Sequence, residues 1–131
     1  MTTIQKIITL WIITVIGMIL HFNYHVGDLF YGIDITVPDA IGVVPNSAHL
    51  MRGVFYHLPI LWIIIALYIQ HKLMRITLFI ISFGYTIAHA MHFFGELTNE
   101  VKDVSQLSLL GIVLVVSFLL NYEHYRYFTV K

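Results

Sequence analysis

Four long apolar stretches alternate with short polar segments along this chain of 131 residues, and they cover about residues 4–23, 49–70, 73–94 and 105–122. A helix needs roughly 20 apolar residues to cross the hydrocarbon core of a bilayer, because it rises about 1.5 Å per residue. Each stretch has about this length. The pattern therefore predicts an all-α integral membrane protein, with one four-helix transmembrane domain over residues 1–131 and the lipid bilayer as its surroundings.

Two of the three connections are short or polar, which favours an antiparallel four-helix bundle. The exception is an outer loop over residues 26–48, which contains Pro38 and Pro45 among many apolar side chains. A segment this apolar is not typical of a flexible linker, and we expect it to cover the mouth of the bundle as a lid or to dock on a partner subunit. The first apolar stretch is too long for the core of a signal peptide, and we interpret it as a retained helix.

The composition agrees with a membrane protein and excludes several functions. Charged residues make up 11% of the chain, against about 25% in soluble domains. The formal net charge is zero, so nothing indicates a nucleic-acid partner. The chain has no cysteine, which excludes disulfides and thiolate metal ligands.

The basic residues are distributed unevenly between the two predicted faces of the membrane. One face has five of them and the other has two, Arg52 and Lys102; the five are Lys6, Lys72, Arg75, Arg126 and Lys131. Because basic residues accumulate in the cytoplasm, both termini are predicted to be cytoplasmic. The bacterial inner membrane is the expected location, with the opposite face toward the periplasm or exterior.

Histidine is concentrated at this outer face. Six of the eight histidines fall in the outer half of a predicted helix or beside it, together with one glutamate; they are His21, His25, His49, His57, His89, His92 and Glu96. Ionisable side chains at membrane depth are costly and usually have a function. Imidazole and carboxylate are suitable ligands for copper, iron or zinc, so all seven residues are candidate metal ligands.

One helix face concentrates these groups further. Tyr85, His89, His92 and Glu96 follow an i, i+4, i+7, i+11 spacing, which places them on one side of a helix. Glu96 is a candidate proton relay and Tyr85 a candidate hydrogen-bond partner for His89. We expect His21, His57, His89 and His92 to bind the metal directly. His25 and His49 are expected to bind the metal or to orient its ligands.

Haem b is the alternative cofactor. His57 and His89 are predicted at matching depth on neighbouring helices, as two axial ligands require, and Arg52 is placed to pair with a propionate. His71 and His124 lie toward the other end of the helices, and we expect both to be surface residues.

Three functions follow from these patterns. The first is a metal-dependent membrane oxidoreductase acting on a lipophilic substrate by redox or oxygen chemistry. The second is a haem-binding electron-transfer or anchor subunit. The third is a non-catalytic protein, either a metal carrier or an accessory subunit of a membrane complex or homo-oligomer, in which the histidines are ordinary residues of the membrane interface.

Overall fold

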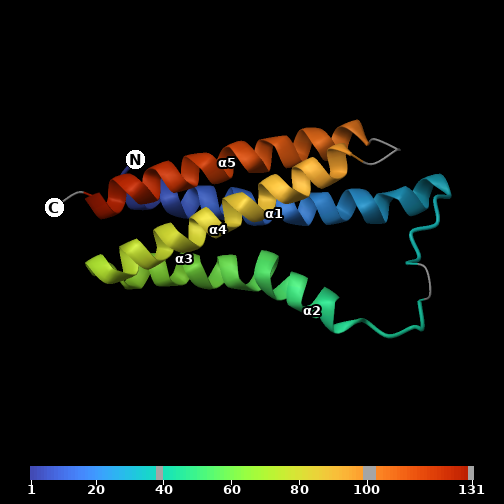
Figure 1. Cartoon of the computed structure of the whole chain (residues 1–131), viewed down its shortest axis with the longest axis horizontal. Helices are drawn as coiled ribbons and strands as arrows, with labels where there is room; N and C mark the ends of the chain where they lie inside the picture. The colour runs from blue at the N-terminus through green and yellow to red at the C-terminus, as the bar shows by residue number, and fades with distance from the viewer. Residues whose placement is uncertain (38–39, 99–102, 130–131) are drawn as a thin grey trace.

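The structure is a computed structural model that describes residues 1–37, 40–98 and 103–129 (Figure 1). Every regular element in these ranges is helical. In chain order they are α1 (Thr3–Gly27), the 3-10 helix η1 (Asp28–Tyr31), α2 (Asn46–Arg52), the π-helical segment η2 (Gly53–His57), α3 (Leu58–Tyr68), α4 (Lys72–Leu97) and α5 (Val104–Thr129).

Four helical segments are long and apolar enough to cross a membrane, as the sequence predicted: Thr3–Tyr31, Asn46–Tyr68, Lys72–Leu97 and Val104–Thr129. Large apolar side chains remain exposed on each of them, for example Ile16, Ile64, Phe83 and Ile112. Surfaces of this kind are stable in contact with lipid tails, so the chain is an integral membrane protein.

The helices lie side by side, and the two ends of the chain are found at the same end of the molecule (Figure 1). Helix α5 packs extensively against both α4 and α1, whereas α3 contacts mainly α1. Seven buried residues form the core between them, namely Ile7, Trp11, Met18, Phe55, Tyr85, Val113 and Leu120.

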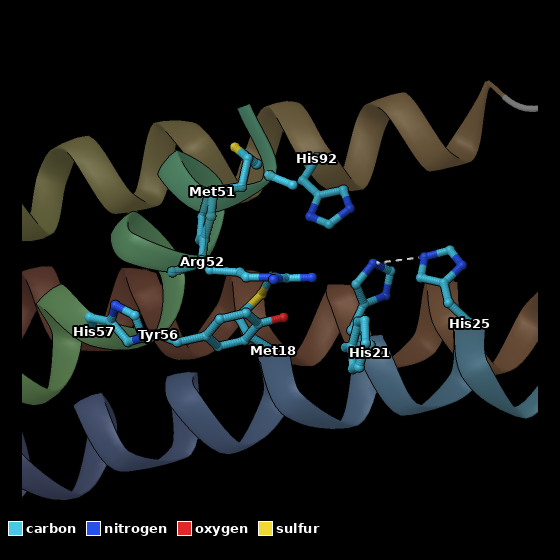
Figure 2. Close-up of a pocket in the computed structure, with 11 residues that line it drawn as sticks. Met18, His21, His25, Met51, Arg52, Tyr56, His57 and His92 are labelled. Carbon is cyan, nitrogen blue, oxygen red and sulfur yellow. Dashed lines mark hydrogen bonds between the residues drawn. The ribbon is translucent and has the colours of Figure 1, made fainter. Parts of the chain in front are cut away.

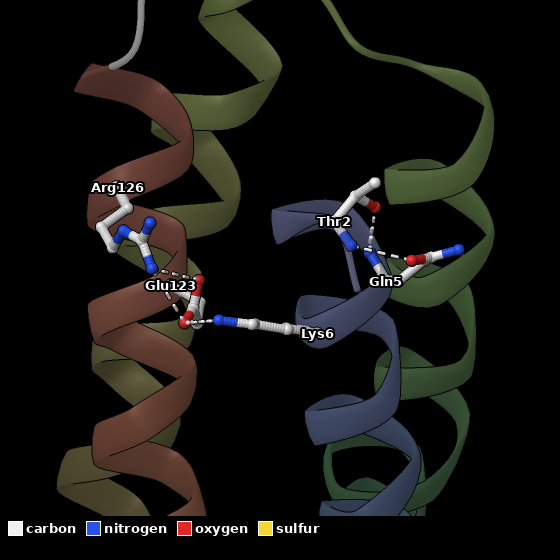
Figure 3. A network of polar contacts seen from close by, with 5 residues as sticks. All are labelled: Thr2, Gln5, Lys6, Glu123 and Arg126. Carbon is white, nitrogen blue, oxygen red and sulfur yellow. Dashed lines mark hydrogen bonds and ion pairs between the residues drawn. The ribbon is translucent and has the colours of Figure 1, made fainter.

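Two side-chain caps define where α1 and α5 begin. The Thr2 side chain accepts a hydrogen bond from the Gln5 backbone, and the Gln5 side chain accepts one from the Thr2 backbone (Figure 3). At the start of α5, the Asp103 carboxylate accepts hydrogen bonds from the backbone N–H groups of Ser105 and Gln106. Such caps satisfy amides that have no partner in the first turn of a helix.

Helix α5 continues to Thr129, about two turns beyond the predicted end at residue 122. Its last turns are held by an ion pair to α1, in which Lys6 Nζ lies 3.1 Å from Glu123 Oε1 (Figure 3). Arg126 also contacts this carboxylate, at 3.4 Å. The predicted end followed the end of the apolar run, but these polar contacts keep the helix regular beyond it.

Small and polar residues bring the helices close together. A Cβ on Gly17 of α1 would overlap the side chain of Val113 on α5. Between α4 and α5, Ser82 Oγ donates to Asn121 Oδ1 and Asn121 Nδ2 donates to Thr86 Oγ1, each at 2.7 Å. Small residues and side-chain hydrogen bonds of this kind stabilise helix contacts inside membranes, where the hydrophobic effect does not.

The second membrane segment changes its helical geometry at η2, directly before Pro59. The Leu58 N–H bonds to the Gly53 carbonyl, five residues back. The Val54 carbonyl would need its donor at the same spacing of five residues, which is Pro59. Proline has no N–H, so this backbone hydrogen bond cannot form. Tyr85 of α4 fills this position, because its hydroxyl donates to the Val54 carbonyl. This contact joins α4 to the irregular part of the second segment.

The outer loop does not form the predicted lid. Its described apolar side chains project into the surroundings, and Phe30 is 89% exposed and Ile41 84% exposed. Residues 28–37 and 40–45 do not line the pocket beside the histidines. Pro38 and Asp39 lie outside the described residues.

Candidate functional site

Two helices bring a compact group of potential metal ligands together. His21 of α1, and His92 and Glu96 of α4, each offer one ligand atom, and these atoms all lie within 4.8 Å of one another. His92 Nε2 is 3.8 Å from Glu96 Oε1, one helical turn away. Two imidazoles and one carboxylate are a common ligand set for iron and other divalent transition metals.

His25 extends this group to a third imidazole. Its Nε2 atom lies 3.2 Å from Nε2 of His21, one turn earlier on α1 (Figure 2). Two nitrogens bound to one tetrahedral ion are about 3.3 Å apart when each metal–nitrogen bond is about 2.0–2.1 Å. The pair therefore has the spacing of two ligands to a single ion, and in the absence of an ion it forms a hydrogen bond.

The His21 ring is also close to the ring of His92, with centroids 4.7 Å apart and planes nearly perpendicular. His21 is buried, whereas His25, His92 and Glu96 are half-buried. The group thus has one ligand inside the helix packing and three nearer the surface. Asp103, at the start of α5, adds a negative charge that interacts electrostatically with His21.

Gln106 of α5 also contacts the candidate site, and the sequence did not predict this. It is buried, and its Nε2 atom lies 3.4 Å from Nδ1 of His25. A contact to the nitrogen that faces away from the metal fixes the ring and tautomer of a ligating histidine. The signal available in the sequence was an amide side chain within the first turn of an otherwise apolar helix.

A pocket of about 620 Å³ adjoins the group (Figure 2). Its wall combines apolar side chains from α1, α2 and η2 with His21, His25 and His92 at one end and His57 at the other (Figure 2); the lining residues are Met18, His21, Phe22, His25, Ala48, Met51, Arg52, Phe55, Tyr56, His57 and His92. This volume is within the range of small-molecule binding sites.

Arg52 is the one arginine in the pocket wall. Its side chain extends from the end of α2 across the pocket, toward the histidines (Figure 2). The sequence placed Arg52 to pair with a haem propionate, and its position in the pocket wall is compatible with binding a carboxylate.

His89 and Tyr85 lie deeper along the same face of α4. His89 is 1% exposed, and neither of its ring nitrogens has a hydrogen-bond partner among the described residues. Its ring lies against Phe55, with centroids 5.6 Å apart. The Tyr85 hydroxyl bonds to the Val54 carbonyl. Tyr85 therefore bridges two helices, and the structure does not show the predicted hydrogen bond to His89.

The structure does not bring His49 or His57 into the ligand group. Both are exposed. His57 lines the pocket at the end away from His21 and His92 (Figure 2). The two residues were predicted from helical depth alone, and η2 rotates the positions around it relative to a regular helix.

The acidic residues of the outer loop also lie apart from the group where the structure describes them. Asp34 is exposed and accepts a hydrogen bond from the Thr36 backbone at 2.9 Å. Hydrogen bonds from the Thr36 side chain and backbone hold the pKa of the Asp34 carboxyl below its ordinary value. Asp34 thus stabilises its own turn.

The prediction for His124 was wrong, whereas that for His71 is confirmed. His124 is fully buried on α5 and accepts a hydrogen bond from Trp11 Nε1 of α1 at 3.2 Å. His71 is exposed, and its Nδ1 atom caps α4 by accepting from the Met74 backbone. The sequence placed His124 in an aromatic, polar tail, but the continuation of α5 turns this side chain inward.

Comparisons of the chain with known protein families, with curated proteins and with solved structures give no match.

Proposed function

We propose that this protein is an integral membrane metalloprotein, an antiparallel four-helix bundle that binds one transition-metal ion near the outer face of the membrane. His21, His92 and Glu96 are the ligands, and His25 is the fourth. The observation that carries this proposal is the convergence of His21, His92 and Glu96 from two helices, with ligand atoms within 4.8 Å of one another.

The proposed chemistry is redox or oxygen chemistry on a lipophilic substrate. Three imidazoles and one carboxylate still leave coordination positions open on a six-coordinate iron(II) ion, where oxygen would bind. The adjoining apolar pocket supplies a place for the substrate beside those positions. Iron(II) is therefore the first metal to test, with copper and zinc as competitors.

The proposed orientation has both termini in the cytoplasm and the ligand group facing the periplasm or exterior. It rests on the excess of basic residues at the end of the molecule where both chain termini lie. Lys102 and Lys131 contribute to that count but lie outside the described residues.

Two variants and two controls test the metal site. The protein is purified without chelator, reconstituted with each metal, and analysed for metal per chain. We expect one ion per chain in the wild type, and loss of the ion in His21→Ala and His92→Ala. His49→Ala and His71→Ala change exposed histidines outside the group and should retain it. Equal metal content in all four variants would reject the site.

The visible absorption spectrum of the same samples tests the haem alternative. Haem b would use His57 and His89, but His57 is exposed and His89 is enclosed in the core. We expect no Soret band in the purified protein. A Soret band that His89→Ala abolishes would replace the non-haem proposal. Oxygen consumption by the iron(II)-loaded protein, stimulated by a lipophilic substrate, is the corresponding test of reactivity.

A further inference from the structure

Arg52 is an exposed cation near the start of a membrane-spanning segment. It belongs to the segment Asn46–Tyr68. Among the residues that the structure describes, no carboxylate forms an ion pair with it. A charge at membrane depth is costly and is usually retained with a partner. An anion bound in the pocket would supply that partner.

The lining of the pocket indicates which kind of molecule carries the anionic group. Apolar side chains from two segments form its walls: Met18 and Phe22 on α1, Met51 at the end of α2, and Phe55 on η2. His21, His25 and His92 lie at one end of the pocket, toward which the Arg52 side chain extends, and His57 lies at the other end (Figure 2). This division matches a molecule with a long apolar tail and a charged head.

We propose that the pocket binds a long-chain carboxylate, with the tail along α1 and η2 and the carboxylate held by Arg52. The guanidinium is a planar fork that binds carboxylates through two parallel hydrogen bonds. Only one arginine lines the pocket, so a singly charged head is the best match. The inference rests on the proposed function, because it names the substrate class for the metal site that adjoins the pocket.

Photoaffinity labelling tests the proposal in the full-length protein, reconstituted in phosphatidylcholine nanodiscs and stripped of metal by a chelator. Two probes share one photoreactive C18 tail, and they end in a carboxylate or in an alcohol. We expect the carboxylate to label α1 and η2 residues at a concentration about tenfold or more below that of the alcohol, since a charge-assisted fork contributes at least that factor. Equal affinity of the wild-type protein for the two probes would by itself overturn the proposal.

The variant Arg52→Gln removes the charge and should raise the half-saturating concentration of the carboxylate about tenfold. It should leave the alcohol unchanged. Lys72→Gln, which removes an exposed cation from the other end of the helices, should leave both probes unchanged. Identical carboxylate labelling in Arg52→Gln and the wild type would contradict the inference.

Metal binding and anion binding are measured separately. Carboxylate labelling that depends on Arg52 in a protein without a metal site would support the pocket and refute the proposed metalloprotein. A stoichiometric ion at His21 and His92, with no preference for the carboxylate probe, would refute the inference and leave the metal site intact.

Discussion

Gln106 on α5 contacts His25 on α1 through an amide-to-imidazole contact of 3.4 Å between Nε2 and Nδ1. With the amide nitrogen as donor, Nδ1 accepts, so His25 Nε2 carries the proton and donates to His21. A metal on both Nε2 atoms requires the other tautomer, in which His25 Nδ1 is the donor. Rotation of the Gln106 amide then presents Oε1, which has no hydrogen-bond partner among the described residues, as the acceptor.

Variants of Gln106 should therefore show whether its side chain acts as a hydrogen-bond acceptor for His25 or only fills space. Gln106→Leu is expected to weaken metal binding about 10–100-fold, as is usual when the outer partner of a ligating histidine is lost. Gln106→Glu keeps an acceptor and should bind at least as tightly as the wild type. Metal titration with a competing chelator measures both. Equal affinities in Gln106→Leu and the wild type would show that this contact has no role in metal binding.

The bond from Tyr85 to the Val54 carbonyl should stabilise the fold because Pro59 removes the donor of that carbonyl. Tyr85→Phe is expected to lower the free energy of unfolding by about 1 kcal/mol, measured by thermal unfolding in detergent. Tyr68→Phe, at an exposed tyrosine, is the control. In a Pro59→Ala background the backbone donor is restored, so the effect of Tyr85→Phe should become smaller. An undiminished effect would contradict this explanation.

His124 should be a structural residue. His124→Ala leaves the buried Trp11 N–H without its acceptor and opens a cavity, so we expect a loss of about 2–4 kcal/mol in unfolding free energy. Metal content should stay unchanged, because Trp11 lies about 15 Å along α1 from His21 at a rise of about 1.5 Å per residue. Elemental analysis alongside unfolding measures both effects. A folded His124→Ala protein without metal would be incompatible with this assignment.

Close packing at Gly17 should affect stability and metal binding together. Gly17→Ala places a methyl group against Val113, which is 1% exposed and has little room to move, and we expect a loss of about 1–3 kcal/mol in unfolding free energy. Metal affinity should also fall, since α1 supplies His21 and α5 supplies Gln106. Gly84→Ala meets no neighbouring atom and is the matched control. Adding Val113→Ala to Gly17→Ala should restore both properties, and failure to restore them would refute the steric explanation.

The membrane segments were predictable from the sequence because lipid requires long apolar helices, and that requirement appears directly as apolar runs. The details were not. The π-helical segment η2 depends on Tyr85 satisfying a carbonyl on another helix, which no local pattern encodes. The burial of His124 depends on Trp11, more than a hundred residues earlier in the chain.

The candidate site was predictable in part for the same reason. Helical spacing predicted that His92 and Glu96 lie on one helix face, and they lie one turn apart, because contacts of this kind are local. Which pairs meet depends on the rotation of each helix about its axis, and this is set by contacts such as Gly17 with Val113. The predicted ligands therefore included His49, His57 and His89, which lie outside the group, and did not include Gln106.

X-ray absorption spectroscopy of the metal-loaded protein tests the central claim most directly, because it counts the ligands of the bound ion. We predict three imidazole nitrogens at about 2.0–2.1 Å with carboxylate oxygen completing the set, and one imidazole fewer in any His25→Ala protein that retains the metal. An ion surrounded only by oxygen ligands, or a spectrum that His21→Ala and His92→Ala leave unchanged, would contradict the proposed site.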